Sequence, residues 1–173
     1  MTKLFLSLIA LVILPAASAQ DRVSLADGRV SFVLPPGFRA MTDAEIKFKF
    51  PRGNAPQYVY ANERLNVSIA ITFSPQALTP GRLSELKAAM EQMLPRTIPG
   101  LTWLTREIEE INGRDWVHFE MTSSAIDTDI HNEMLFTAFD GRMLGFNFNA
   151  TVALHGQYKD ALQKSRDSIR ILP

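Results

Sequence analysis

The chain has 173 residues, with 18 Lys and Arg against 18 Asp and Glu, and a formal net charge of zero. This balance argues against a nucleic-acid-binding protein, because such proteins need a basic surface to neutralise phosphates. The sequence has no cysteine, which excludes disulfides, thiolate metal sites and thiol catalysis, so the fold must depend on its hydrophobic core.

The N-terminus has the pattern of a bacterial signal peptide. Lys3 supplies a positive start, residues 4–14 are almost unbroken in apolar character, and the small residues Ala17-Ser18-Ala19 precede a cleavage site before Gln20. The apolar run is shorter than the roughly 20 residues that span a bilayer, and no cysteine is present for lipid attachment. We therefore expect removal of residues 1–19, a single domain over residues 20–173, no membrane anchor and a periplasmic location.

Turn residues predict a series of antiparallel hairpins. The dipeptides Asp27-Gly28, Asn112-Gly113 and Asp140-Gly141 favour positive φ at two successive positions, which suits tight hairpin turns. A fourth hairpin is expected to turn at Asn62-Glu63-Arg64. The expected strands lie near 22–26, 29–34, 57–61, 65–73, 102–111, 114–123, 130–139 and 142–152.

Two amphipathic helices are expected between and after these hairpins. The first begins at the N-cap Thr79 with Pro80 in the first position, and Pro95 is expected to end it. The second runs from about 155 to 168, and residues 43–48 form at most one helical turn. The apolar stripes comprise Leu83, Leu86, Met90 and Leu94 in the first helix, and Leu154, Tyr158, Leu162 and Ser165 in the second, which closes against Ile169 and Ile171. The fold class is therefore α+β, an antiparallel sheet of hairpins covered by two amphipathic helices.

Tight turns fix the register of a hairpin, so the residues that share a face can be predicted. Around Asn112-Gly113, the expected core face comprises Leu104, Ile108, Val117, Phe119 and Met121, and the other face Glu107, Glu109, Trp116, His118 and Glu120. Around Asp140-Gly141, the expected core face comprises Leu135, Phe139, Leu144, Phe146 and Phe148.

The opposite face of the last hairpin is the candidate ligand-binding surface. It carries Asn132, Met134, Phe136, Asn147 and Asn149. Amides among aromatic and thioether groups can bind a small polar ligand or a peptide backbone. Alternatively, a helix covers this face and the amides lie at its rim, an arrangement that the apolar members favour.

Two groups of titratable residues suggest further chemistry. Asp129, His131 and Glu133 share one strand face and offer ligands for a divalent ion, but residues two apart on a strand lie about 6–7 Å apart. A solvated strand end explains them better, so no metal is expected. His118 has acidic neighbours in Glu107, Glu109 and Glu120, which form either a pH-responsive patch or ordinary cross-strand pairs.

The sequence lacks the serine elbow, phosphate loop, dinucleotide fingerprint and His-Glu-x-x-His motif, so we expect no enzyme activity and no cofactor. The segments "DGRVSFVLPPGF", "YVYANERLNVSIAITF", "LSELKAAMEQML", "REIEEINGRDWVHFEMTS" and "HNEMLFTAFDGRMLGFNFNAT" follow one another between about Val23 and Leu172. In this order they resemble the PsbP-like and DcrB-like group of exported bacterial proteins. The resemblance implies a PsbP-like fold and an accessory or binding role within an assembly, and it transfers no functional residue.

The sequence thus predicts a non-enzymatic periplasmic accessory protein that acts by binding another periplasmic or secreted protein. The contact surface is expected to be a sheet face or the loop from Pro51 to Pro56. The alternatives are an immunity protein that neutralises a secreted toxin, a small-ligand carrier that uses the amide-bearing face, and a hydrolase built on carboxylates.

Overall fold

The computed structural model describes residues 21–51, 53–125 and 127–172. The predicted signal peptide lies outside the described residues. The strands are β1 (Arg22–Leu25), β2 (Val30–Val33), β3 (Arg39–Ala40), β4 (Tyr58–Ala61), β5 (Val67–Ala77), β6 (Thr102–Ile111), β7 (Arg114–Ser124), β8 (Asp129–Phe139), β9 (Arg142–Thr151) and β10 (Arg170–Ile171). The α-helices are α1 (Asp43–Lys49), α2 (Leu83–Thr97) and α3 (Val152–Asp167), and a 3-10 turn, η1 (Pro80–Arg82), leads into α2.

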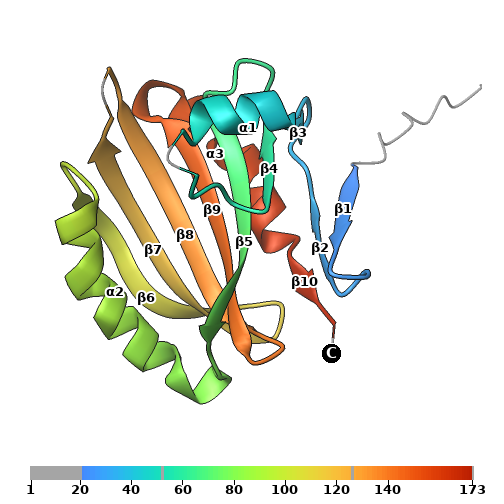
Figure 1. The fold of residues 1–173 in the computed structure, drawn as a ribbon, viewed down its shortest axis with the longest axis vertical. Helices are drawn as coiled ribbons and strands as arrows, with labels where there is room; N and C mark the ends of the chain where they lie inside the picture. The colour runs from blue at the N-terminus through green and yellow to red at the C-terminus, as the bar shows by residue number, and fades with distance from the viewer. Residues whose placement is uncertain (1–20, 52, 126, 173) are drawn as a thin grey trace, which may run out of the picture.

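The strands form two antiparallel sheets, which confirms the α+β class (Figure 1). The larger sheet has seven strands in the order β3-β4-β5-β9-β8-β7-β6, and the smaller has three in the order β1-β2-β10. The first predicted hairpin therefore leaves the main sheet and pairs with the C-terminal strand β10, which the sequence pattern did not predict. Ser31 and Val30 are the β2 residues opposite β10.

Two of the predicted tight turns have the expected geometry. Asn112 and Gly113 have φ values of 52° and 76°, and Asp140 and Gly141 have 51° and 72°. Asp27-Gly28 is different, because Leu25 pairs with Val30 and four residues form the turn. The strands there are shorter than predicted, and the turn is held by the Arg29 amide, which donates to the Ala26 carbonyl at 3.1 Å.

One face of the seven-stranded sheet, here called the α3 face, carries α3 and the small sheet. Phe146 is fully buried on this face and makes edge-to-face contacts with Phe32 of the small sheet and with Trp116. The predicted core face of the last hairpin is confirmed here, since Leu135, Phe139, Leu144, Phe146 and Phe148 belong to this one hydrophobic cluster. Leu162 of α3 completes it.

The opposite face, here called the α2 face, carries α2 at one side and α1 at the other (Figure 1). The predicted stripe of α2 is confirmed, because its four apolar residues are buried against Val117, Phe119 and Met121. Helix α1 is longer than the single turn expected. Its capping box is formed by Thr42 and Glu45.

Two local predictions were wrong. Pro95 does not end α2, which continues to Thr97; a proline near the end of a helix removes only one donor, and the Ile98 amide still reaches the Leu94 carbonyl at 2.9 Å. Leu104 and Ile108 are 55% and 38% exposed instead of lying in the core. Strand β6 is the edge of the sheet, and an irregularity between Trp103 and Thr105 turns Trp103 toward the core in place of Leu104.

Among the described residues, no helix has both the length and the apolar character needed to cross a membrane.

Candidate functional site

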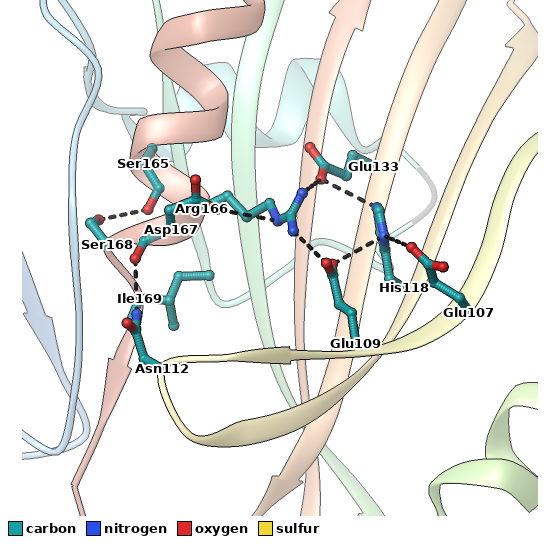
Figure 2. Close-up of polar contacts among 10 residues, drawn as sticks. All are labelled: Glu107, Glu109, Asn112, His118, Glu133, Ser165, Arg166, Asp167, Ser168 and Ile169. Carbon is teal, nitrogen blue, oxygen red and sulfur yellow. Dashed lines mark hydrogen bonds and ion pairs between the residues drawn. The ribbon is translucent and has the colours of Figure 1, made fainter.

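Four charged or titratable side chains meet on the α3 face, each from a different element (Figure 2). Arg166 of α3 donates from Nη2 to Glu109 Oε2 of β6 at 2.6 Å and from Nη1 to Glu133 Oε1 of β8 at 3.0 Å. The His118 imidazole of β7 lies between the same two carboxylates, with Nδ1 3.0 Å from Glu109 Oε1 and Nε2 3.3 Å from Glu133 Oε1. We call Glu109, His118, Glu133 and Arg166 the Arg166 cluster.

The sheet register explains how three of these residues come together. Glu107 pairs with His118, and Glu120 pairs with Glu133, so Glu109 and Glu133 are the diagonal neighbours of His118 on the same face. Diagonal neighbours on adjacent strands lie within reach of long side chains.

The position of Arg166 depends on how the end of α3 is held (Figure 2). Ser165 is buried, and its hydroxyl donates to the Val33 carbonyl of the small sheet at 2.6 Å. The Asn112 side chain donates to the carbonyls of Asp167 and Ile169 at 2.8 and 2.7 Å. The turn residue of the β6–β7 hairpin thus anchors the segment that follows Arg166.

The environment of the cluster shifts two pKa values. Burial lowers the pKa of His118, but the contacts with Glu133 and Glu109 outweigh burial and leave the pKa above its ordinary value. Burial raises the pKa of Glu133, but His118 and Arg166 outweigh it and leave that pKa below its ordinary value. Two carboxylates face one guanidinium and one imidazole, so the cluster is neutral only when His118 is protonated.

The cluster lies at the edge of an open hollow of about 260 Å³. Glu120, His155 and Lys159 also line this hollow. Burial and the neighbouring His131 lower the pKa of His155. Arg166 donates a hydrogen bond to one oxygen of Glu109 and to one oxygen of Glu133. The cluster is therefore an ion-pair network that joins α3 to three strands.

The five predicted ligand-binding residues all lie on the α2 face of β8 and β9. Asn132 is opposite Asn149, and Met134 is opposite Asn147. Phe136 and Met134 pack against the hydrophobic cluster that α2 forms with the sheet. This agrees with the alternative that a helix covers this face. The Phe136 ring lies over Gly145, where an added Cβ would come within 3.0 Å of the ring.

Two of the amide residues have polar neighbours on the adjacent strands. Asn132 Nδ2 donates to Ser123 Oγ at 2.9 Å, and Asn149 lies opposite Ser68 of β5. The Oδ1 atom of Asn147 is buried and has no hydrogen-bond partner among the residues that the structure describes. Binding of a ligand by these residues stays a prediction.

The predicted titratable groups are only partly brought together. Asp129 accepts a hydrogen bond from the Ser124 hydroxyl at 3.0 Å, and Glu133 belongs to the Arg166 cluster, so Asp129, His131 and Glu133 do not meet as one ligand set. His131 instead contacts Glu120, with His131 Nε2 2.9 Å from Glu120 Oε1.

The predicted acidic surroundings of His118 are confirmed for Glu109 and Glu107. Glu107 lies 3.7 Å from His118 Nδ1 and is largely exposed. Glu120 was wrongly assigned to this group. Arg166 and Glu133 were missed: Glu133 is recoverable from the register of β7 and β8, whereas Arg166 comes from a helix whose placement no local pattern specifies.

Comparison with known proteins gives matches among solved structures alone. No known family matches the chain, and no curated protein sequence matches it. The cyanobacterial PsbP (CyanoP) of Synechocystis superposes with a TM-score of 0.62 at 14% identity, over 92% of this chain and 97% of CyanoP.

Two further solved structures have similar architecture. LpqN of Mycobacterium tuberculosis, described as involved in cell envelope biogenesis, gives a TM-score of 0.55 at 12% identity, over 89% of this chain and 91% of LpqN. The Ran-binding protein Mog1p of Saccharomyces cerevisiae gives 0.51 at 12% identity, over 88% of this chain and 95% of Mog1p. At these identities the similarity establishes the fold, and the chain has the PsbP-like fold that the sequence resemblance implied.

Proposed function

We propose that the protein is an exported accessory protein that acts by binding another protein through the surface around Phe48. The predicted signal peptide supports export, and the similarity to LpqN, described as involved in cell envelope biogenesis, supports an accessory role in the cell envelope. Mog1p, a protein named for binding Ran, has the same fold, although a shared fold does not by itself transfer a function.

The exposure of Phe48 carries this proposal. Helix α1 packs against β4 and β5 through Ile46 and Phe50. Phe48, which stands between these two residues in the sequence, has 85% of its surface exposed. Covering a phenylalanine side chain contributes about 1.5–3 kcal/mol. Aromatic residues are enriched at protein interfaces for this reason.

The loop that follows α1 extends this surface. Pro51 and residues 53–55 are exposed, and Pro56 is half-buried. These exposed residues follow Phe48 closely in the sequence, and exposed backbone groups suit a contact between two proteins. The sequence analysis named the same loop as a candidate contact surface.

The experiment places a photo-crosslinking amino acid at position 48 and, as a matched control, at Met93, which is 46% exposed on α2. We expect one crosslinked protein from the periplasm with the probe at position 48 and none at position 93. The purified partner should then bind the wild type and bind the Phe48→Ser variant at least about tenfold more weakly, a loss of about 1.4 kcal/mol. Retention of the protein in the cytoplasm, or equal binding by the Phe48→Ser and Met93→Ser variants, would refute the proposal.

A small-ligand carrier is the second candidate, and the buried Oδ1 of Asn147, which lacks a hydrogen-bond partner in the described part of the chain, favours it. A ligand that donates a hydrogen bond to this atom would satisfy it. A metabolite screen should then find a compound that raises the melting temperature of the wild type and has no such effect on the Asn147→Ala variant. A screen in which every stabilising compound acts equally on Asn147→Ala would exclude this site.

A further inference from the structure

A second group of metal-ligating side chains lies next to the Arg166 cluster. Glu120 of β7, His131 of β8 and His155 of α3 each offer one ligand atom, and these atoms lie within 4.8 Å of one another. His131 is buried, with 8% exposure, and its Nε2 lies 2.9 Å from Glu120 Oε1. The rings of His131 and His155 are stacked, with centroids 3.5 Å apart and planes inclined by 14°.

The chemistry of this group suits a late first-row divalent ion. Two imidazoles and one carboxylate form a ligand set found at zinc sites that keep a position open for water. Two ligand atoms that each lie about 2.1 Å from one zinc ion at the tetrahedral angle are separated by about 3.4 Å. His131 Nε2 and Glu120 Oε1 are 2.9 Å apart, a hydrogen-bond distance, so these two atoms must move apart by about 0.5 Å to bind one ion.

The carboxylate of Glu120 is held in place from its other side. The Thr105 hydroxyl donates to Glu120 Oε2 at 3.2 Å, which leaves Oε1 directed toward His131. A hydrogen bond to the second oxygen of a ligating carboxylate orients the carboxylate and strengthens metal binding.

Binding also requires a larger rearrangement, which involves His155. A metal lies in the plane of each imidazole that binds it, and two parallel rings 3.5 Å apart cannot both satisfy this condition. His155 must therefore turn its ring away from His131. His155 is half-buried in the first turn of α3 and lines the open hollow, so its ring has space to turn.

The charges nearby favour this group over its neighbour. Glu107, Glu109 and His118 also offer three ligand atoms within 4.8 Å of one another. Arg166 already pairs with Glu109 at 2.6 Å, and the positive charge of the guanidinium opposes binding of a metal cation there. The Glu120 group has Lys159 beside it on α3, and this side chain is exposed and can move into solvent.

We propose that Glu120, His131 and His155 bind a zinc-like divalent cation at the mouth of this hollow. The ion would connect β7, β8 and the beginning of α3. This site is independent of the protein-binding surface around Phe48.

The test is calorimetry of Zn²⁺ binding to the purified, tag-free protein after treatment with a chelator, together with the visible absorption of the Co²⁺ form. We expect one Zn²⁺ per chain, and weakening of at least about tenfold in His155→Gln and in Glu120→Gln. Glu85→Gln and Asp160→Asn, two carboxylate changes outside the group, should bind as the wild type does. Zn²⁺ should also raise the melting temperature of the wild type and not that of His155→Gln, because an ion that binds the folded state stabilises it.

His155 and Glu120 are not deeply buried, so their variants are expected to fold, and circular dichroism of each variant checks this. Absence of Zn²⁺ binding by the wild type would overturn the proposal. Equal binding by His155→Gln, or loss of binding in His118→Gln alone, would overturn it as well by assigning the ion to another group.

Discussion

Replacing Arg166 by methionine tests whether the Arg166 cluster holds the end of α3 on the sheet. The change keeps most of the apolar stem and removes the guanidinium that bonds Glu109 at 2.6 Å and Glu133 at 3.0 Å. The side chains of Arg166, Glu109 and Glu133 are 16%, 22% and 16% exposed, so the two carboxylates are left in a poorly solvated place without this partner.

Removal of one partner from a fully buried ion pair costs about 3–5 kcal/mol. The residual exposure of the cluster reduces this cost, and a protonated His118 still compensates one carboxylate. We therefore expect a loss of about 2–3 kcal/mol in the free energy of unfolding at pH 7, measured by urea denaturation followed by circular dichroism.

The deficit should depend on pH in a definite direction. Arg166 lowers the pKa of Glu133 in the folded wild type, so its removal raises that pKa and the folded variant gains a proton at a higher pH. Arg166 also lowers the pKa of His118, and its removal favours the charged imidazole. Both effects stabilise the variant relative to the wild type as pH falls, so the deficit should be smaller at pH 5 than at pH 8.

Arg96→Met is the matched control, because Arg96 is exposed in the last turn of α2. Its effect should lie within about 0.5 kcal/mol of zero. Adding Glu133→Gln to Arg166→Met should restore part of the stability at pH 7, because an unpaired charge is replaced by a neutral amide. A deficit for Arg166→Met no larger than that of the control, or one that grows on acidification, would refute this reasoning.

Two other predictions address the capping of α1 and the anchoring of α3. The hydrogen bonds from Arg39 and Thr42 lower the pKa of Glu45 to about 2, so the contribution of the Glu45 carboxylate to stability is present above pH 4.5 and is lost as pH falls toward 2. The wild type should therefore be more stable than Glu45→Gln in urea titrations at pH 7 and equal to it at pH 2. A stability difference that does not change with pH would contradict this role of Glu45. Asn112→Asp keeps a residue that tolerates positive φ but replaces the donor to the Ile169 carbonyl at 2.7 Å with a carboxylate, so we expect a loss of about 1–3 kcal/mol in thermal or urea unfolding. An Asn112→Asp variant as stable as the wild type would contradict the anchoring role.

The sequence by itself determined the local elements of this protein. Asn112-Gly113 and Asp140-Gly141 specify their turns because both positions need positive φ, which asparagine, aspartate and glycine adopt at little cost. The register that these turns impose then assigned Phe146 and Leu135 to one core face. The period of apolar residues in α2 likewise predicted its buried stripe.

Only the tertiary structure decided how these elements are assembled. The pairing of β2 with β10 and the reach of Arg166 to Glu109 join segments that lie far apart in the chain, and neither turn chemistry nor periodicity carries information about such contacts. The same holds for the stacking of His155 on His131, because a helix that covers a sheet is positioned by the shape of the whole core. Local backbone preferences therefore specified the strands and turns, whereas packing between distant segments created the groups of titratable side chains on the α3 face.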